Sequence, residues 1–491
     1  MIDSSVSLSD LARVSGVAFG TSGARGLVSA MTDEVCYGYT VGFLRHLIAQ
    51  QEWEPGKSVA LAGDLRPSTP SIIAACCAAI ADLGGRPQFC GFVPTPALAY
   101  YAMKRGMPSL MVTGSHIPDD RNGIKFYRPS GEILKEDERL ILSQAVETPS
   151  ATGPHGTISG NLPDVVAEAA ADYISRYTDC FGVEGLKGLK VGVYQHSAVG
   201  RDLLAEILSG LGAQVTALGR SSRFVPVDTE AVRPADVELA RAWAAHGDFD
   251  AIVSTDGDSD RPLIADEHGE WLRGDVVALL CARQLSMQIV VTPVSSNTNV
   301  ERCGLFRQII RTRIGSPYVI EAMQSALSAG EDGVCGYEAN GGFLLGSDLW
   351  INGTQLTALP TRDAVLPIIA VLAASKGSSV RRLAEGLPAR ATASARIQKF
   401  ASERGAAVMD WLACASEGML RISQTFAPIA GAEFRAIDNT DGLRMTFAND
   451  RIIHLRQSGN APELRCYAEA ETPDIADFLA SGSLEFIGKN F

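Results

Sequence analysis

The sequence predicts an α/β fold built from successive units and followed by a C-terminal α+β module. The first third of the chain alternates short apolar runs with helical patterns, and the middle of the chain repeats that alternation twice. The C-terminal part instead shows three successive strand patterns and one closing helix. The chain has 491 residues, and because a domain usually has about 100–200 residues, three or four domains are expected.

The first unit is a β-α-β-α-β series. Thr69-Pro70 and Thr95-Pro96 each have the pattern of an N-cap followed by proline at the first helical position, and glycines follow at the expected helix ends. Apolar runs before, between and after these helices indicate buried strands. The predicted strands are Ser58–Ala62, Gln88–Val93 and Ser109–Val112, and the predicted helices are Thr69–Leu83 and Thr95–Gly106.

The second and third units repeat this architecture without any repeat of the residues themselves. The second has predicted strands at Leu189–Tyr194, Gln214–Leu218 and Asp250–Ser254 and helices at Arg201–Leu208 and Asp236–Ala245. The third has predicted helices at Asp275–Leu285 and Ser316–Leu327 and strands at Gln288–Pro293 and Gln308–Arg311.

The last unit differs from the first three. Strands are predicted at Leu443–Phe447, Ile452–Arg456 and Glu463–Ala468, and a helix that opens at Thr472-Pro473 is expected to end near Ser481. Successive strands followed by a helix are typical of an α+β module.

Composition indicates where the units separate. Thr148–Gly160 is rich in Pro, Gly, Ser and Thr, which is typical of a linker. Ser375–Ser379 is a weaker second boundary, and the break between the second and third units is expected just after Asp260.

Composition also excludes several classes of partner. Lys plus Arg is 43 and Asp plus Glu is 56, so the net charge of −13 argues against a general nucleic-acid binder. The longest clean apolar run, Ile72–Ala81, is too short for a bilayer, which needs about 20 residues. No signal peptide is expected, because Met1–Gly16 has no basic start followed by an apolar block, and the ten cysteines form no C-x-x-C motif. Reduced, mostly buried thiols in a cytoplasmic protein without a membrane partner are expected.

A serine loop follows the third strand of the first unit. The segment MVTGSHIPDDRNGIKFY carries Ser115 just beyond a strand end, where ligands gather in open α/β sheets. Ser115 is therefore placed as a nucleophile, and His116 and Lys125 are candidates for proton transfer or phosphate contact. An ordinary serine-containing turn is the alternative for this segment alone.

An acidic loop follows the last strand of the second unit. In DAIVSTDGDSDRP, the residues Asp256, Asp258 and Asp260 alternate, and such carboxylates repel one another unless a cation neutralises them. Hard oxygen ligands suit Mg²⁺ or Ca²⁺. An EF-hand is rejected because its sixth position, a required glycine, is Arg261, and because a strand precedes the loop. A solvated acidic turn remains the alternative.

Three further loops add anion and hydroxyl binding. RQSGNAPELR lies between two predicted strands and offers a turn of free N–H groups with two flanking arginines, Arg456 and Arg465. FGTSGARG supplies Arg25 but is not a P-loop, and GYEANGGF carries Glu338 and Asn340. Each could be a structural turn, but together with the serine and acidic loops they would serve a phosphorylated substrate in a cleft between domains.

These motifs resemble the α-D-phosphohexomutase family of phosphomannomutases and phosphoglucomutases. GTSGARG is similar to its GTSG-x-RG, TGSHIPDDRNGIKFY to its phosphoserine loop and DGDSDR to its metal loop. GYEANGG is similar to its sugar loop, usually G-E-x-S-G-H, and RQSGNAPELR to its phosphate loop, usually R-x-S-G-T-E-P. The resemblance covers essentially the whole chain, with the motifs in the family's order.

The resemblance implies three similar α/β domains with mixed sheets and a smaller C-terminal α+β domain around a central cleft. The expected domains are 1–155, 156–262, 263–380 and 381–491. It also implies a phosphorylated Ser115 and Mg²⁺ held by the phosphoserine oxygen and the three aspartates. Arg25, His116, Lys125 and Arg261 would line the reaction centre, Glu338 and Asn340 would bind sugar hydroxyls, and Arg456, Ser458, Gly459, Asn460 and Arg465 would hold the distal phosphate.

The expected activity is interconversion of hexose 6-phosphate and hexose 1-phosphate, with mannose preferred, through a hexose 1,6-bisphosphate that also serves as activator. Lys125 is the first candidate for the general base and His116 the second. Departures from the family pattern include Gly114 beside the serine, Asn340 for the sugar-loop serine and Gly342 for its histidine. A phosphoglucomutase, a dual-specificity mutase, a serine-dependent sugar-phosphate phosphatase and a non-catalytic sugar-phosphate-binding regulator are the alternatives. A monomer or small homo-oligomer is expected.

Overall fold

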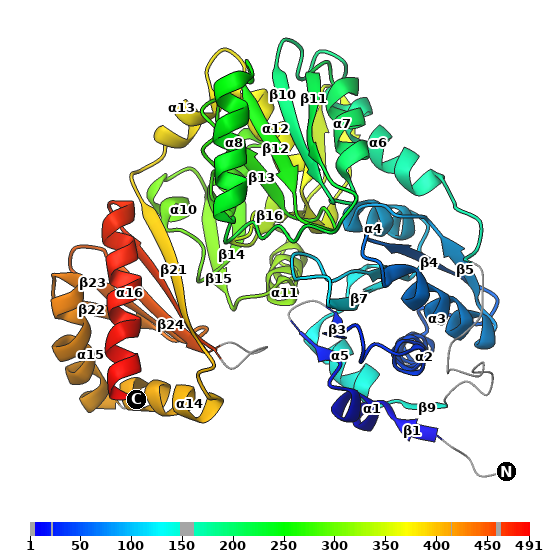
Figure 1. Cartoon of the computed structure of the whole chain (residues 1–491), viewed down its shortest axis with the longest axis horizontal. Coiled ribbons are helices and arrows are strands. Elements are labelled where there is room, and N and C mark those ends of the chain that lie inside the picture. The colour runs from blue at the N-terminus through cyan, green and yellow to red at the C-terminus, as the bar shows by residue number, and fades with distance from the viewer. Residues whose placement is uncertain (1–4, 21–22, 148–161, 414, 458–462) are drawn as a thin grey trace.

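The computed structural model describes residues 5–20, 23–147, 162–413, 415–457 and 463–491. Figure 1 shows four units in an open arc, with the N-terminal unit in blue and cyan at one end and the C-terminal unit in orange and red at the other. Within the described ranges, no helix is long and apolar enough to cross a membrane. The described cysteines are free thiols.

The first unit holds a seven-stranded mixed sheet in the order β2-β3-β7-β6-β4-β5, with β8 paired to β7. β4 runs parallel to β5 and β6, whereas β7, β3 and β2 are antiparallel to their neighbours. The strands are β2 (Ala18–Phe19), β3 (Ala24–Leu27), β4 (Ser58–Gly63), β5 (Arg86–Phe89), β6 (Ser109–Val112), β7 (Arg121–Arg128) and β8 (Gly131–Glu132), besides the pair β1 (Ser5–Ser7) and β9 (Ala145–Glu147). The helices are α1 (Leu8–Ser15), α2 (Asp33–Ala49), α3 (Thr69–Asp82), α4 (Thr95–Lys104) and α5 (Lys135–Leu142).

The second unit holds a four-stranded sheet in the order β11-β10-β12-β13. The strands are β10 (Lys190–His196), β11 (Gln214–Arg220), β12 (Ala251–Thr255) and β13 (Pro262–Ala265), and the helices are α6 (Glu168–Phe181), α7 (Arg201–Gly210) and α8 (Pro234–His246). β13 is antiparallel to β12, so the second sheet continues a few residues beyond Asp260.

The third unit holds a five-stranded sheet in the order β15-β14-β16-β17-β20 and a separate hairpin, β18-β19. The strands are β14 (Ile289–Pro293), β15 (Gln308–Thr312), β16 (Val334–Tyr337), β17 (Phe343–Leu345), β18 (Leu349–Ile351), β19 (Thr354–Leu356) and β20 (Leu359–Asp363). The helices are α9 (Gly274–Gln284), α10 (Asn299–Arg302), α11 (Ser316–Ser328), α12 (Val365–Ser375) and α13 (Val380–Glu385).

The three sheets share one strand pattern. In each, a parallel strand (β6, β12 or β16) is followed along the chain by an antiparallel neighbour (β7, β13 or β17). The connecting loops, 113–120, 256–261 and 338–342, are the serine, acidic and sugar loops of the sequence. Each functional loop therefore leaves the carboxyl end of an equivalent strand.

The fourth unit is an antiparallel sheet in the order β21-β25-β24-β23-β22, with α16 packed against β21 and β25. Its strands are β21 (Ala391–Gln398), β22 (Phe434–Asp438), β23 (Leu443–Phe447), β24 (Ile452–Gln457) and β25 (Glu463–Ala470), and its helices are α14 (Ser402–Ala413), α15 (Ala415–Ala430) and α16 (Pro473–Asn490). Three mixed α/β units and this α+β unit confirm the predicted fold class.

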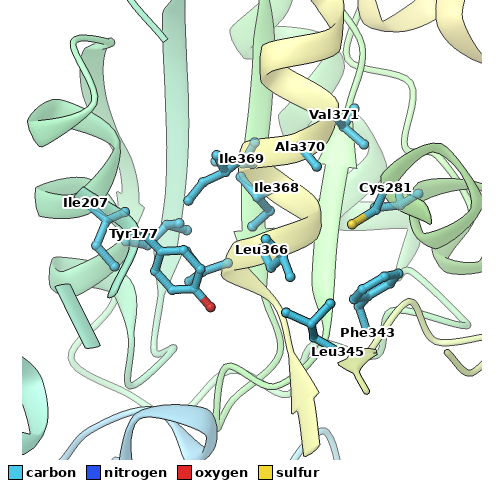
Figure 2. Close-up of a cluster of buried hydrophobic side chains, with 14 of the residues drawn as sticks. Tyr177, Ile207, Cys281, Phe343, Leu345, Leu366, Ile368, Ile369, Ala370 and Val371 are labelled. Atoms are coloured by element: carbon cyan, nitrogen blue, oxygen red, sulfur yellow. The ribbon is translucent and has the colours of Figure 1, made fainter. Parts of the chain in front are cut away.

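The second and third units share one continuous core. Figure 2 shows Ile368 and Ile369 of α12 between Tyr177 and Ile207 on one side and Phe343 on the other, and all these side chains are fully buried. Close packing of this kind holds the two sheets in a fixed relative position.

Two predicted boundaries are wrong. The prediction that the closing helix ends near Ser481 fails because Leu484 and Ile487, which follow it, are buried in the core of the fourth unit, and α16 continues to Asn490. β5 lies earlier in the chain than the predicted Gln88–Val93, because its place at the sheet edge tolerates Pro87.

Candidate active site

Ser115 sits in a strained loop at the end of β6. Its φ angle is 56°, in the left-handed region that residues other than glycine rarely adopt. Two contacts hold this conformation: the Ser115 N–H donates to Oγ1 of Thr113 at 2.8 Å, and Nη2 of Arg66 donates to the Ser115 carbonyl at 3.0 Å. The hydroxyl of Ser115 is thus presented from a fixed backbone.

Arg66 supports the serine loop from behind. Its guanidinium is fully buried, bonds Asp64 and the carbonyl of Ile117, and lies 4.0 Å over the ring of Phe224 from the second unit. A Cβ at Gly114 would lie 2.7 Å from Cζ of Arg66. Glycine at position 114, a departure from the family pattern, therefore leaves the space that Arg66 occupies.

The acidic loop forms a group of buried carboxylates. One oxygen from each of Asp256, Asp258 and Asp260 lies within 4.8 Å of the others, and all three residues are 0% exposed. The hydroxyl of Ser115 donates to Oδ2 of Asp256 at 2.6 Å. Oδ1 of Asp258 and Oδ1 of Asp260 are buried without a hydrogen-bond partner among the described residues. Converging carboxylate oxygens with unused lone pairs suit a hard divalent cation.

Lys125 neutralises part of this charge. Its Nζ donates to Oδ2 of Asp258 at 2.6 Å and to Oδ2 of Asp260 at 2.5 Å. Burial alone would raise the pKa of Asp258, but the Lys125 ion pair holds that pKa below its usual value. Burial and the charges of Asp258 and Asp260 raise the pKa of Asp256 well above its usual value. A bound cation would favour the ionised form of Asp256.

His116 lies beside the serine, with Arg261 and Arg25 close to its ring. Nη1 of Arg261 lies 2.9 Å from Nδ1 of His116, and this imidazole nitrogen lies 3.4 Å from Oγ of Ser115. Burial and the charges of Arg261 and Arg25 hold the pKa of His116 well below its usual value, so its ring is neutral at pH 7. Burial and Arg261 lower the pKa of Arg25 to about 10, which leaves that side chain charged.

The sugar loop is a tight turn between β16 and β17. The Glu338 N–H donates to the Gly342 carbonyl at 3.3 Å, and the Gly342 N–H donates to Oδ1 of Asn340 at 2.9 Å. Thr229 of the second unit donates to the Asn340 carbonyl at 2.8 Å. Both Glu338 and Asn340 are buried, so the loop fixes their polar groups against neighbouring elements.

Arg362 joins the sugar loop to the acidic loop, and sequence reasoning missed it. Its Nε donates to Oδ2 of Asp260 and its Nη1 to Oε2 of Glu338, each at 3.0 Å. A single arginine inside a strand has no motif around it, so no local signal could have singled it out.

The phosphate loop belongs to the fourth unit. Arg456 and Arg465 stand directly opposite each other on β24 and β25, so their side chains leave the same face of the sheet. Arg456 donates to Asp441 at 2.8 Å, and Arg465 pairs with Glu463 at 3.2 Å. In Figure 1 this end of the sheet points toward the middle of the arc. Ser458, Gly459 and Asn460 lie outside the described residues.

The chain resembles known proteins over nearly its whole length. Residues 16–152, 171–269 and 273–391 match the phosphoglucomutase/phosphomannomutase alpha/beta/alpha domains I, II and III. A phosphomannomutase from Sinorhizobium fredii is 44% identical over 97% of this chain and 99% of its own. The chain belongs to the phosphoglucomutase/phosphomannomutase family. A phosphomannomutase from Salmonella muenchen is 47% identical over 95% of this chain and 95% of its own.

A solved structure of another family member shows the same fold. The phosphoglucomutase/phosphomannomutase family protein from Burkholderia thailandensis superposes with a TM-score of 0.72 at 19% identity, covering 99% of this chain and 98% of its own. The four-unit arrangement is therefore that of the family, and the serine, acidic and sugar loops occupy equivalent strand ends within it.

Proposed function

We propose that this protein is a phosphomannomutase that interconverts mannose 6-phosphate and mannose 1-phosphate through a phosphorylated Ser115. The observation that carries the proposal is the placement of the Ser115 hydroxyl. It bonds a member of the three-carboxylate group at 2.6 Å, Nδ1 of His116 lies 3.4 Å from it, and Arg261 bonds the His116 ring with Arg25 nearby. A nucleophile beside clustered cations and a cation site is the arrangement that phosphoryl transfer requires.

Relatives support mannose as the sugar. The phosphomannomutases from S. fredii and S. muenchen are 44% and 47% identical to this chain, whereas the phosphoglucosamine mutase from Sorangium cellulosum is 27% identical. Mannose and glucose differ in the orientation of one hydroxyl. We assign the reading of that hydroxyl to Glu338 or Asn340, whose polar groups the sugar loop holds in place.

The reaction proceeds in two transfers. The phosphoryl group leaves Oγ of Ser115 and bonds to the free sugar hydroxyl, whose proton passes to a base while Oγ of Ser115 takes up a proton. The resulting hexose 1,6-bisphosphate turns around, and its other phosphoryl group returns to Oγ of Ser115, which gives up its proton while the departing sugar oxygen takes one up. The same bisphosphate, added in trace amounts, phosphorylates an enzyme that has lost its phosphate. Arg25 and Arg261 stabilise the charge on the transferring oxygens.

Lys125 and His116 remain the candidate bases, in the order expected from the sequence. Nζ of Lys125 lies 2.6 Å from Oδ2 of Asp258 and 2.5 Å from Oδ2 of Asp260, at the acidic loop. The neutral ring of His116 accepts a hydrogen bond from Nη1 of Arg261 at Nδ1, so this lone pair is already engaged and His116 stays the second candidate.

Mg²⁺ is the proposed metal. Asp256, Asp258 and Asp260 would hold it together with an oxygen of the phosphorylated Ser115, and their hard oxygen donors suit Mg²⁺. When bound, the ion would stabilise negative charge on the transferring phosphoryl group.

The fourth unit would bind the phosphate group of the substrate that is not being transferred. Arg456 and Arg465 share one face of the β24-β25 pair, and arginine suits bidentate recognition of phosphate. The same residues must bind a phosphate group in both orientations of the sugar, before and after it turns around. Ser458, Gly459 and Asn460 remain the expected partners of these arginines in this contact.

A domain limit at 155, a cytoplasmic location and a monomer or small homo-oligomer complete the proposal. The limits expected at 262 and 380 move to the end of β13 at Ala265 and the end of α13 at Glu385.

One assay separates the proposed mutase from its rivals. Purified protein with mannose 1-phosphate, Mg²⁺ and a trace of hexose 1,6-bisphosphate should form mannose 6-phosphate without stoichiometric inorganic phosphate. Stoichiometric phosphate release would instead indicate a phosphatase, and binding without turnover a regulator. The ratio of kcat/KM for mannose 1-phosphate and glucose 1-phosphate should favour mannose, and a ratio in favour of glucose would make the protein a phosphoglucomutase.

A further inference from the structure

Three consecutive residues of β20 each contact a different part of the molecule. Oγ1 of Thr361 donates to Glu132 of the first unit at 2.6 Å. Asp363 accepts hydrogen bonds from Tyr173 and Tyr177 of α6 in the second unit. Neighbouring side chains of a strand point to opposite faces, so these two anchors fix the backbone while Arg362 points the other way.

Arg362 spans two functional loops from this fixed position. Its Nε donates to Oδ2 of Asp260 in the acidic loop, and its Nη1 donates to Oε2 of Glu338 in the sugar loop, each at 3.0 Å. The side chain is only 1% exposed, so water does not compete for these bonds. Hydrogen bonds between charged groups in such surroundings are stronger and more directional than those on a surface.

The sugar loop leaves a space that fits Arg362. A Cβ at Gly342 would lie 2.7 Å from Cδ and 2.8 Å from Cγ of Arg362. Any side chain at position 342 would displace the arginine. Gly342 and Arg362 are therefore matched to each other.

We propose that Arg362 is a positioning residue of the mutase, which locks the sugar-binding carboxylate of Glu338 to the metal-binding carboxylate of Asp260. This inference rests on the proposed function. Arg362 fixes the distance between sugar hydroxyl and reacting phosphoryl group, because each is held by a loop that Arg362 bonds. If a sugar hydroxyl has the wrong orientation to bond Glu338, the hydroxyl that should accept the phosphoryl group is therefore misplaced relative to Ser115.

Two substitutions of Arg362 separate charge from geometry. Arg362→Lys keeps the charge but loses the planar fork that reaches both carboxylates. It should raise the KM for mannose 1-phosphate about tenfold and reduce the mannose-to-glucose preference. Arg362→Met keeps much of the volume but leaves Glu338 and Asp260 without this partner, so kcat/KM should fall about 100-fold.

Arg451→Met is the matched control. Arg451 is partly buried and bonds Glu471 and the Ala430 carbonyl within the fourth unit, at the end of β24 opposite to Arg456. Its loss should lower the melting temperature but leave KM and the sugar preference within about twofold of the original protein.

A double-mutant cycle tests the proposed coupling. If Arg362 acts through Glu338, then Glu338→Gln in the Arg362→Met background should cost no more than about threefold beyond the larger single loss. Gly342→Ala should mimic the loss of Arg362 and should cost little more when combined with Arg362→Ala. Provided that the unsubstituted protein has mutase turnover, two results would overturn the inference. One is unchanged kinetics in Arg362→Lys, and the other is additive losses of kcat/KM in the cycle of Arg362 and Glu338. If the unsubstituted protein lacks turnover, the proposed function fails and this inference fails with it.

Discussion

The hydroxyl of Ser115 donates a 2.6 Å hydrogen bond to Asp256, although the two residues are 141 positions apart and belong to different sheets. The bond joins the serine loop at the end of β6 to the acidic loop at the end of β12. Because both loops leave equivalent strand ends, two successive units meet at one reaction centre. Arg362 adds the third unit through its bond to Asp260.

Removing one carboxylate from the acidic loop should weaken metal dependence. In Asp258→Asn, the Mg²⁺ concentration that gives half-maximal rate should rise at least about tenfold, because a charged hard ligand is lost. The measurement is initial rate against free Mg²⁺ after chelation.

Asp236→Asn serves as its control. Asp236 is a buried carboxylate bonded to Arg233 and Tyr194, outside the site. Its substitution should destabilise the fold without changing the Mg²⁺ response. An unchanged Mg²⁺ response in Asp258→Asn would argue against the acidic loop as the metal site.

Gly114→Ala should disturb the serine without touching substrate. The new Cβ would meet Arg66, whose bonds to the Ser115 and Ile117 carbonyls hold the loop. We expect kcat to fall at least about tenfold with little change in KM, since a misaligned nucleophile loses rate rather than affinity. Gly482→Ala, in α16 far from any close contact, should keep full activity. An unchanged kcat in Gly114→Ala would contradict the role of Arg66 in holding the serine loop.

Acid should destabilise the protein through His196. Burial lowers the pKa of this fully buried imidazole to about 4, against about 6.5 in the unfolded chain. Between these values the unfolded state binds a proton that the native state excludes. Stability therefore falls as pH drops through this window, by up to about 3 kcal/mol.

Urea denaturation at pH 7 and pH 5 measures this contribution. His196→Gln should flatten the pH dependence, whereas His246→Gln, at an exposed helix end, should not. An equally steep loss of stability in His196→Gln would assign the acid sensitivity to other groups.

The sequence predicted most parallel strands and crossover helices, because they carry clear apolar runs and Thr-Pro caps, but it missed the parallel strand β16 and the helix α12. It did not predict β7, β13 and β17, which begin directly after functional loops. The polar and glycine residues with which β7 begins, Arg121-Asn122-Gly123, are typical of a turn, so the pattern does not indicate a strand there. Their pairing is decided by neighbouring strands that are distant in the chain.

The site was predicted where motifs are local and missed where it depends on packing. Ser115 and the three aspartates lie within short, distinctive segments. Arg66 and Arg362 act through contacts with residues far along the chain, and only the space left by Gly114 and Gly342 reveals them. The two glycines looked like departures from the family pattern, whereas in the structure each accommodates a buried arginine.

Transfer of a labelled phosphoryl group tests the central claim most directly. Protein carrying ³²P on Ser115, isolated after incubation with labelled hexose 1,6-bisphosphate, would be mixed with unlabelled mannose 1-phosphate in a single turnover. The account predicts that the label moves to the sugar and that Ser115→Ala takes up no label and loses at least about 10³-fold in turnover. Label released as inorganic phosphate, or labelling and turnover retained in Ser115→Ala, would contradict it.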